Sequence, residues 1–294
     1  MLFFIFQNSR IYKLCFELSF LNSCRFLNRA LIAPDHLEEE GWLCSIAEVE
    51  EAKAVLRLFP IWCSCLVYGI VIEQHVTFFI KQGATMDRMI ISGFNIPSAS
   101  FQSISTVFVL IFLPIYDRIL VPIARSFTGN SSGITMLQRI GTGIFISIII
   151  MILAALVEMK RLKTIREYDL VDNPSATIPM SIWWMLPHNI LFGVADVFTM
   201  VGMQEFFYDQ VPTELRSIGL ALFISVAGVG SFLSAFLVSI IDRATSGSDK
   251  DSWIPNNLNK AHLDYYYWLL TGLSALGFAC YLHFAKSYIY NRKM

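Results

Sequence analysis

The sequence has few charges, and those it has are nearly balanced in sign. Of 294 residues, 15% are Asp, Glu, Lys or Arg, and the formal net charge is −1. The basic excess that attracts nucleic acid is absent, so no nucleic-acid partner is expected. Hydrophobic residues make up 55% of the chain, and the mean hydropathy is +0.56. A soluble fold must cover its surface with polar groups, so the chain is predicted to be an integral membrane protein.

The sequence also lacks the patterns of a metal site or an enzyme active site. The six cysteines have no metal-ligand spacing, and Cys63 and Cys65, two residues apart, would point to different sides of a helix. They are interpreted as packing residues. An intramembrane enzyme needs clustered ligands or a nucleophile with its base, but the histidines show no H-E-x-x-H or related spacing. We therefore expect no metal, no cofactor and no enzymatic activity.

Long apolar runs dominate what is present. Each is near or above the ~20 residues that a membrane-spanning helix needs. The connections between them are short and often rich in Gly, Pro, Asn, Asp and Ser, which suit turns. The prediction is an all-α membrane protein in which six transmembrane helices form one antiparallel bundle. The six runs cover residues 54–80, 97–122, 134–157, 179–208, 215–241 and 263–287.

The start of the chain differs from the rest. It has no basic n-region and no small-residue cleavage site, so a signal peptide is not expected. Residues 28–58 mix charged and apolar residues, and Ser45 precedes Glu48 by three residues, as at a capped helix start. We predict an N-terminal segment and solvent-side linker over residues 1–53 and the bundle over residues 54–294.

The distribution of Lys and Arg does not decide the orientation of this bundle. These residues divide almost evenly between its two sides, and the stretch "EMKRLKTIRE" (158–167) opposes an orientation with the linker in the cytoplasm. That orientation also places the sequon at Asn130 in the cytoplasm. A glycan on Asn130 would contradict it.

One predicted helix carries a stripe of small residues. Such stripes let helix backbones approach closely in membranes. We interpret this one as ordinary helix packing rather than a gate, because membrane interfaces are generally built from small residues. Its members are Ser225, Gly228, Ser231, Ser234 and Ala235.

Carboxylates inside apolar runs are the strongest functional signal. A charge at mid-bilayer costs on the order of 3 kcal/mol even on mild insertion scales. Glu73 shares a helix face with Trp62 and Gly69, and either a hydrated position near the interface or a cavity role would explain it. Asp196 and Glu205 are nine residues apart and therefore lie on opposite faces of one helix. Position alone favours Asp196 as the deeper group and Glu205 as the group nearer the cytoplasmic end.

Several stretches resemble one family in order along the chain. The sequence "VADVFTMVGMQEFFYDQVPTELRSIGLAL" (194–222) is similar to the tenth transmembrane helix and following loop of the plant nitrate/peptide transporter family. These are the proton-dependent oligopeptide transporters of the major facilitator superfamily. Further similar stretches are "RLFPIW" (57–62), "TFFIKQGATMDR" (77–88), "PIYDRILVPIAR" (114–125), "GITMLQRIGTGIF" (133–145) and "ALVEMKRLKT" (155–164).

The resemblance implies that the six runs are helices seven to twelve of a twelve-helix fold, its C-terminal half. Residues 1–53 then include the cytoplasmic linker between the halves. The family's E-x-x-E-R motif belongs to the other half and is not found in this sequence. The implied function is proton-coupled symport of a small solute such as a peptide, nitrate or other organic anion, within a lipid membrane. The alternative is a truncated, non-transporting fragment or a regulatory protein that needs a separate N-terminal half.

The resemblance also singles out site residues. Glu205 matches the tenth-helix carboxylate that faces the central cavity and pairs with a Lys of the N-terminal half or with substrate. No answering charge for it is therefore expected within this sequence. Glu73 and Gln74 resemble the "EQ" of peptide-carrying members, and Tyr208 is a further candidate for the lining. Ile72 stands where nitrate-associated members have a His, which disfavours nitrate.

Asp117 and Arg118 resemble the G-x-x-x-D-R loop motif of the superfamily, with Leu113 at the Gly position. They are predicted to lie in a loop. The superfamily scaffold hosts many solutes, so the resemblance fixes neither the substrate nor the choice between plasma membrane and vacuolar membrane.

Overall fold

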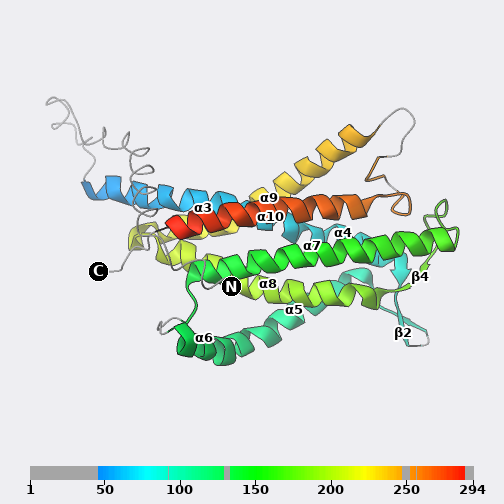
Figure 1. The fold of residues 1–294 in the computed structure, drawn as a ribbon, viewed down its shortest axis with the longest axis horizontal. Helices are drawn as coiled ribbons and strands as arrows, with labels where there is room; N and C mark the ends of the chain where they lie inside the picture. Colours follow the sequence, from blue (N-terminus) through cyan, green and yellow to red (C-terminus); the bar gives the residue numbers. More distant parts are fainter. Residues whose placement is uncertain (1–45, 92, 129–132, 247–251, 256, 289–294) are drawn as a thin grey trace.

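The structure is a computed structural model that describes residues 46–91, 93–128, 133–246, 252–255 and 257–288. Within this part of the chain, six helical segments are long and apolar enough to cross a membrane, as the sequence predicts. Figure 1 shows them side by side along the long axis of the molecule. They are built from α3 (Ile46–Val76) with α4 (Phe78–Thr85), α5 (Ser98–Ile115) with α6 (Val121–Thr128), α7 (Met136–Glu167), α8 (Leu186–Asp209), α9 (Arg216–Thr245) and α10 (Leu263–Ser287).

The helices form one bundle, in which some helices are buried by their neighbours much more than others. Helix α7 packs against α8 and α10, α3 packs against α9 and α10, and α8 contacts α5 and α9. Figure 1 shows α5 and α6 along one edge and α3 and α9 along the opposite edge. Helices α5 and α9 are the least covered, with Leu110 and Phe232 among their exposed apolar side chains. Both helices therefore present broad apolar faces outward.

Helices α3 and α9 meet at the small-residue stripe. A Cβ added to Gly230 would lie 2.6 Å from the Cα of Gly69, so the two backbones are in direct contact. Ser225 accepts a hydrogen bond from Trp62 Nε1 at 2.9 Å. The close backbone contact thus lies beside the stripe at Gly230, and Ser225 of the stripe takes part in the packing, whereas Gly228 has open space around it.

The first span begins earlier than predicted and is interrupted near its end. Helix α3 is continuous from Ile46, so the predicted boundary between residues 53 and 54 falls inside a helix. The hydroxyl of Thr77 donates to the carbonyl of Glu73, a side-chain bond that bends helices, and Thr77 separates α3 from α4. The rest of the predicted linker, the capping residue Ser45 and the sequon at Asn130 lie outside the described residues.

The third span ends later than predicted. Hydropathy places its end at residue 157, but α7 continues to Glu167. The charged turn stays helical and buried because Glu158 and Arg161, both 0% exposed, form an ion pair of 2.6 Å. Short strands lie at this end of the bundle: β1 (Met86–Asp87) pairs in parallel with β4 (Ile178–Ser181), and β2 (Met89–Ile91) pairs with β3 (Phe94–Asn95).

Asp117 and Arg118 do not lie in a loop, so that prediction is wrong. They are exposed residues of a π-helical turn, Tyr116–Leu120, between α5 and α6. Pro114 inside α5 removes a backbone donor and crowds the preceding turn. A π-helical turn follows directly, which keeps the segment helical.

Candidate functional site

Glu205 lies one turn before the end of α8 and has a partner within this chain. Its Oε2 accepts a hydrogen bond from Arg139 Nη1 of α7 at 2.6 Å. The expectation that no answering charge exists in this sequence is therefore wrong. Gly202 makes the contact possible, because a Cβ there would meet the Arg139 side chain at 3.2 Å. Sequence reasoning gave Arg139 no role in the site.

Local sequence fixes where Arg139 stands. Thr135 and Gln138 form a capping box at the start of α7, and the side chain of each accepts from the backbone N–H of the other. Arg139 thus belongs to the first turn of the helix, beside Glu205. Its guanidinium also lies over the ring of Tyr116, 5.0 Å from the centroid.

Exposure within this ion pair is unequal. The Glu205 side chain is 40% exposed, whereas that of Arg139 is 11% exposed. The cation is held in place by α7, by α8 and by Tyr116 of the π-helical turn, and the carboxylate is open on one side. This arrangement allows Glu205 to meet a second charge while Arg139 stays where it is.

Glu73 and Gln74 face α9. Glu73 accepts a hydrogen bond from the hydroxyl of Ser231. Gln74 Nε2 donates to Ser234 Oγ at 3.1 Å and to the carbonyl of Ile70 at 2.9 Å. The two residues therefore join α3 to the small-residue stripe, where Glu73 remains partly exposed and Gln74 is buried.

His75, the next residue, faces α5 and α8. Its Nε2 lies 2.8 Å from Ser105 Oγ and 3.0 Å from Asn189 Oδ1, and Gln102 Nε2 lies 2.9 Å from its Nδ1. Asn189 uses its amide group to donate to the carbonyl of Met185 at 2.7 Å, which leaves Oδ1 as the acceptor for His75. With Gln102 donating to Nδ1, the proton of the neutral ring sits on Nε2.

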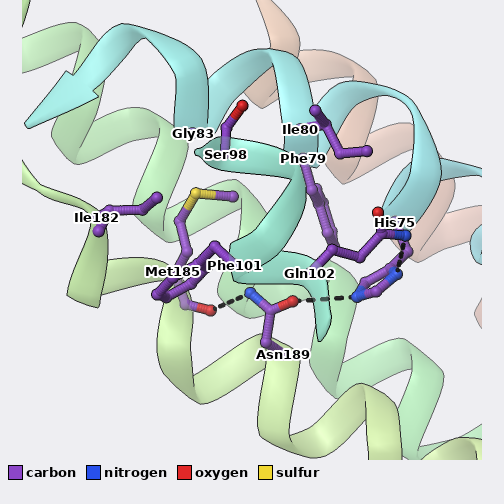
Figure 2. Close-up of a pocket in the computed structure, with 10 residues that line it drawn as sticks. All are labelled: His75, Phe79, Ile80, Gly83, Ser98, Phe101, Gln102, Ile182, Met185 and Asn189. Atoms are coloured by element: carbon purple, nitrogen blue, oxygen red, sulfur yellow. Dashed lines mark hydrogen bonds between the residues drawn. The ribbon is translucent and has the colours of Figure 1, made fainter. Parts of the chain in front are cut away.

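This polar cluster borders a small pocket. Figure 2 shows His75, Gln102 and Asn189 converging on one side of it. The ring of His75 is stacked on Phe192 with 4.1 Å between centroids, and Phe79 lies edge-on to His188 at 4.6 Å. Sequence reasoning gave this cluster no role. Polar residues within apolar helices, here His75, Gln102 and Asn189, are the pattern that could have indicated it. The pocket is lined by His75, Phe79, Ile80, Gly83, Ser98, Phe101, Gln102, Ile182, Met185 and Asn189.

Asp196 points to a different helix from Glu205. It accepts a hydrogen bond of 2.8 Å from the hydroxyl of Tyr68 on α3, and Tyr68 is buried. Since Glu205 points to α7, the two carboxylates lie on different sides of α8, as their spacing predicts. Tyr208 is 37% exposed, and the guanidinium of Arg216 lies 4.6 Å from its ring centroid.

A second ionic cluster lies towards the other end of α7 from Arg139. Arg161 makes two hydrogen bonds to Glu158, at 2.7 and 2.6 Å, and one to the carbonyl of Leu258 at 2.9 Å. Gln82 Nε2 donates to Glu158 at 2.7 Å, and Arg161 Nη1 donates to Thr85 Oγ1 at 3.2 Å. Both charges are satisfied within the protein, so the cluster is interpreted as structural.

Comparison with known proteins identifies the family. A sequence model described as "PTR2: POT family" matches residues 6–254. The chain belongs to the POT family.

The relatives of this POT family chain include plant proteins. It is 61% identical over 267 residues to "Protein NRT1/ PTR FAMILY 5.10" of Arabidopsis thaliana, which covers 91% of this chain and 47% of the relative. It is 60% identical to "Protein NRT1/ PTR FAMILY 5.12" of the same plant, with 91% and 46% covered. The chain thus spans about half the length of the curated relatives it matches.

Solved structures of POT family transporters share the fold. A structure titled "Crystal structure of auto inhibited POT family peptide transporter" matches with a TM-score of 0.60 at 19% identity, over 84% of this chain and 44% of that one. The POT family transporter PepTSo matches with a TM-score of 0.58 at 17% identity, over 94% and 54%. The predictions of family and of a six-helix C-terminal half of a major facilitator fold in a multi-pass membrane protein are confirmed.

The candidate residues of this POT family chain do not form one constellation. Among the described residues, no hydrogen bond or ion pair joins Glu205 to Glu73, Gln74 or Tyr208. Each is bound to a different neighbour. For these residues to contact one solute, the solute would have to lie between this bundle and a second protein surface.

Proposed function

We propose that this chain is the C-terminal half of a proton-coupled symporter for a small solute, with Glu205 as its exchangeable carboxylate. The ion pair of Glu205 with Arg139 carries the proposal. A carboxylate inside a membrane bundle is costly, and such groups mark proton or substrate pathways. Because this carboxylate is paired on one side and open on the other, it has both a resting partner and access to an incoming one.

The coupling step follows from the chemistry of the pair. A proton on Glu205 removes the negative charge that holds Arg139 at 2.6 Å. The guanidinium then retains its contact with the Tyr116 ring and can attract an anionic group of a solute. Loss of the proton restores the ion pair and displaces that group. Proton and solute thereby bind and leave together.

The second wall of the substrate site is supplied by an N-terminal half. Transporters of this superfamily bind substrate between two halves near the bilayer midplane. The half-length match to the relatives and the exposed apolar faces of α5 and α9 support this part of the proposal. Glu73, Gln74 and Tyr208 are proposed as further lining residues.

A peptide or other organic anion is proposed as the solute in preference to nitrate. Ile72 stands where a nitrate-associated His is expected. Glu73 stays partly exposed at the α3–α9 contact, where it can receive an amino group. This carboxylate would suit a peptide N-terminus.

The test is uptake into proteoliposomes that contain this chain together with the N-terminal half of Protein NRT1/PTR FAMILY 5.10. Uptake of a dipeptide panel should depend on an inward proton gradient. Glu205→Gln should abolish it while leaving membrane insertion intact. Glu214→Gln is the matched control, since Glu214 is an exposed residue beyond the end of α8. Gradient-driven uptake that survives Glu205→Gln would refute the assignment of Glu205.

A further inference from the structure

A wide cavity opens where α7 and α9 end and α10 begins. Its volume is about 730 Å³, within the range of roughly 300–1,000 Å³ that is typical of ligand sites. It lies far from Glu205: Arg166 at the cavity and Arg139 at the ion pair are separated by about 40 Å along α7 at 1.5 Å per residue. The cavity is lined by Leu162, Arg166, Val171, Asp172, Ala244, Thr245, Trp253, Asn259, Lys260, Ala261, His262 and Tyr265.

Hydrogen bonds between loops preform this cavity. Asn259 Nδ2 donates to the carbonyls of Leu170 and Asn173, each at 3.0 Å. Asn257 Nδ2 donates to the carbonyl of Val171 at 3.1 Å. The segment before α10 is thereby fixed to the segment after α7, and the walls exist without a ligand.

The charges of the lining favour an anion. Lys260 pairs with Asp172 at 2.8 Å, while Arg166 forms no ion pair within the described part of the chain. Its basic neighbours on α7 are each occupied: Lys160 lies 3.1 Å from the Trp184 ring centroid, and Lys163 pairs with Glu167 at 3.7 Å. The lining thus has two cationic side chains, Arg166 and Lys260, against the carboxylate of Asp172, and no described carboxylate pairs with Arg166.

Aromatic rings form the wall on the α10 side. Trp253 and Tyr265 have ring centroids 5.4 Å apart, and His262 is stacked on Tyr265 at 5.0 Å. Trp and Tyr at the ends of spanning helices sit at the level of lipid headgroups. The α10 side of the cavity, where Tyr265 lies in the first turn of the helix, is therefore at the depth of the lipid headgroups.

Apolar surface continues from the cavity along two helices. Ile240 precedes the lining residue Ala244 by one helical turn on α9, and Leu269 follows the lining residue Tyr265 by one turn on α10. Both side chains are exposed, and residues four apart share a helix face. Figure 1 shows the last turns of α9 leaning away from α10. A ligand with an anionic head in the cavity would have an apolar surface for its tails.

We propose that this cavity binds an anionic phospholipid. The phosphate contacts Arg166 and Lys260, the aromatic wall lies beside the glycerol region, and the acyl chains follow the exposed apolar residues of α9 and α10. Charge-assisted hydrogen bonds from the guanidinium and the ammonium group would hold the phosphate. The site is complete within this chain and does not depend on the transport function.

The test is native mass spectrometry of the purified full chain in detergent with dioleoyl phosphatidylglycerol, dioleoyl phosphatidylcholine and glycerol 3-phosphate. Phosphatidylglycerol should bind about tenfold more tightly than phosphatidylcholine, the factor expected when one charge-assisted contact distinguishes two ligands. Arg166→Gln should lower phosphatidylglycerol binding to the level of phosphatidylcholine. Lys163→Gln, which removes an equal charge from the same helix outside the lining, should retain the preference.

Three outcomes would overturn the proposal. Equal binding of the two lipids would show that no anion is recognised, and an unchanged preference in Arg166→Gln would place the recognition elsewhere. Competition by glycerol 3-phosphate at the affinity of the lipid would identify a site for a soluble anion instead.

Discussion

Among single residues, the buried charges of α7 are the most constrained. Glu158 and Arg161 are fully buried, one turn apart, and bound to Gln82, Thr85 and the carbonyl of Leu258. A buried ion pair does not stabilise a protein unless its remaining donors and acceptors are also bonded. Here they are, so the whole cluster joins α4, α7 and the segment before α10.

Removing one partner of this pair should therefore be costly. Arg161→Met leaves Glu158 as a buried charge with only Gln82 to bond it, and the expected loss of unfolding free energy is about 3–5 kcal/mol. Thermal unfolding of the chain in detergent measures this loss. The double variant Glu158→Leu with Arg161→Met should recover most of it, because no buried charge remains.

The matched control is Lys163→Met. Lys163 is exposed and forms only a loose pair with Glu167 at 3.7 Å, so the change should cost less than about 1 kcal/mol. If Arg161→Met is as mild as this control, the buried cluster is not a major source of stability.

Among the helices, the contact of α3 with α9 depends on two glycines. A Cβ at Gly230 would lie 2.6 Å from backbone atoms of Gly69, and neither backbone can yield without separating the helices. Gly230→Ala should lower the free energy of unfolding by about 1–3 kcal/mol through overpacking. It should also loosen the hydrogen bonds of Glu73 and Gln74 to α9, which thermal unfolding and hydrogen exchange of α3 would detect.

Gly228 provides the control on the same helix. It has no heavy atom within 4 Å of an added Cβ, so Gly228→Ala should be neutral or stabilise α9 by up to about 1 kcal/mol through helix propensity. Equal effects of the two substitutions would show that the α3–α9 backbone contact is not tight.

The elements also show what hydropathy can predict. All six spans follow from apolar runs because each run is long enough to cross a membrane on its own. The end of α7 does not follow, since a window of hydropathy counts Glu158 and Arg161 as two charges and cannot register that they neutralise each other. The π-helical turn at Asp117 was missed for a related reason: the motif suggested a loop, whereas the helix continues past Pro114.

The candidate site was predictable only in part. Glu205 could be singled out from the sequence because a carboxylate within an apolar run costs free energy in a membrane and therefore indicates a function. Its partner Arg139 lies sixty-six positions away and becomes visible only when α7 and α8 pack together. The same holds for His75, whose partners come from α5 and α8.

For the whole molecule, the two least covered helices decide how the chain assembles. Helices α5 and α9 expose Leu110 and Phe232. Helix α7, which exposes Leu156, is buried over a much larger share of its apolar stretch. If an N-terminal half completes the transporter, the α5 and α9 faces should contact it, and Leu156 should remain in lipid.

Photocrosslinking with p-benzoylphenylalanine at positions 110, 232 and 156 measures the difference, using the tagged N-terminal half of Protein NRT1/PTR FAMILY 5.10 in the same membrane. Crosslinks should form from positions 110 and 232 and be several-fold weaker from position 156, because a crosslinker surrounded by lipid meets no protein. Equal yields from all three positions would mean that the halves meet at random, and crosslinks from position 156 alone would place the interface on α7.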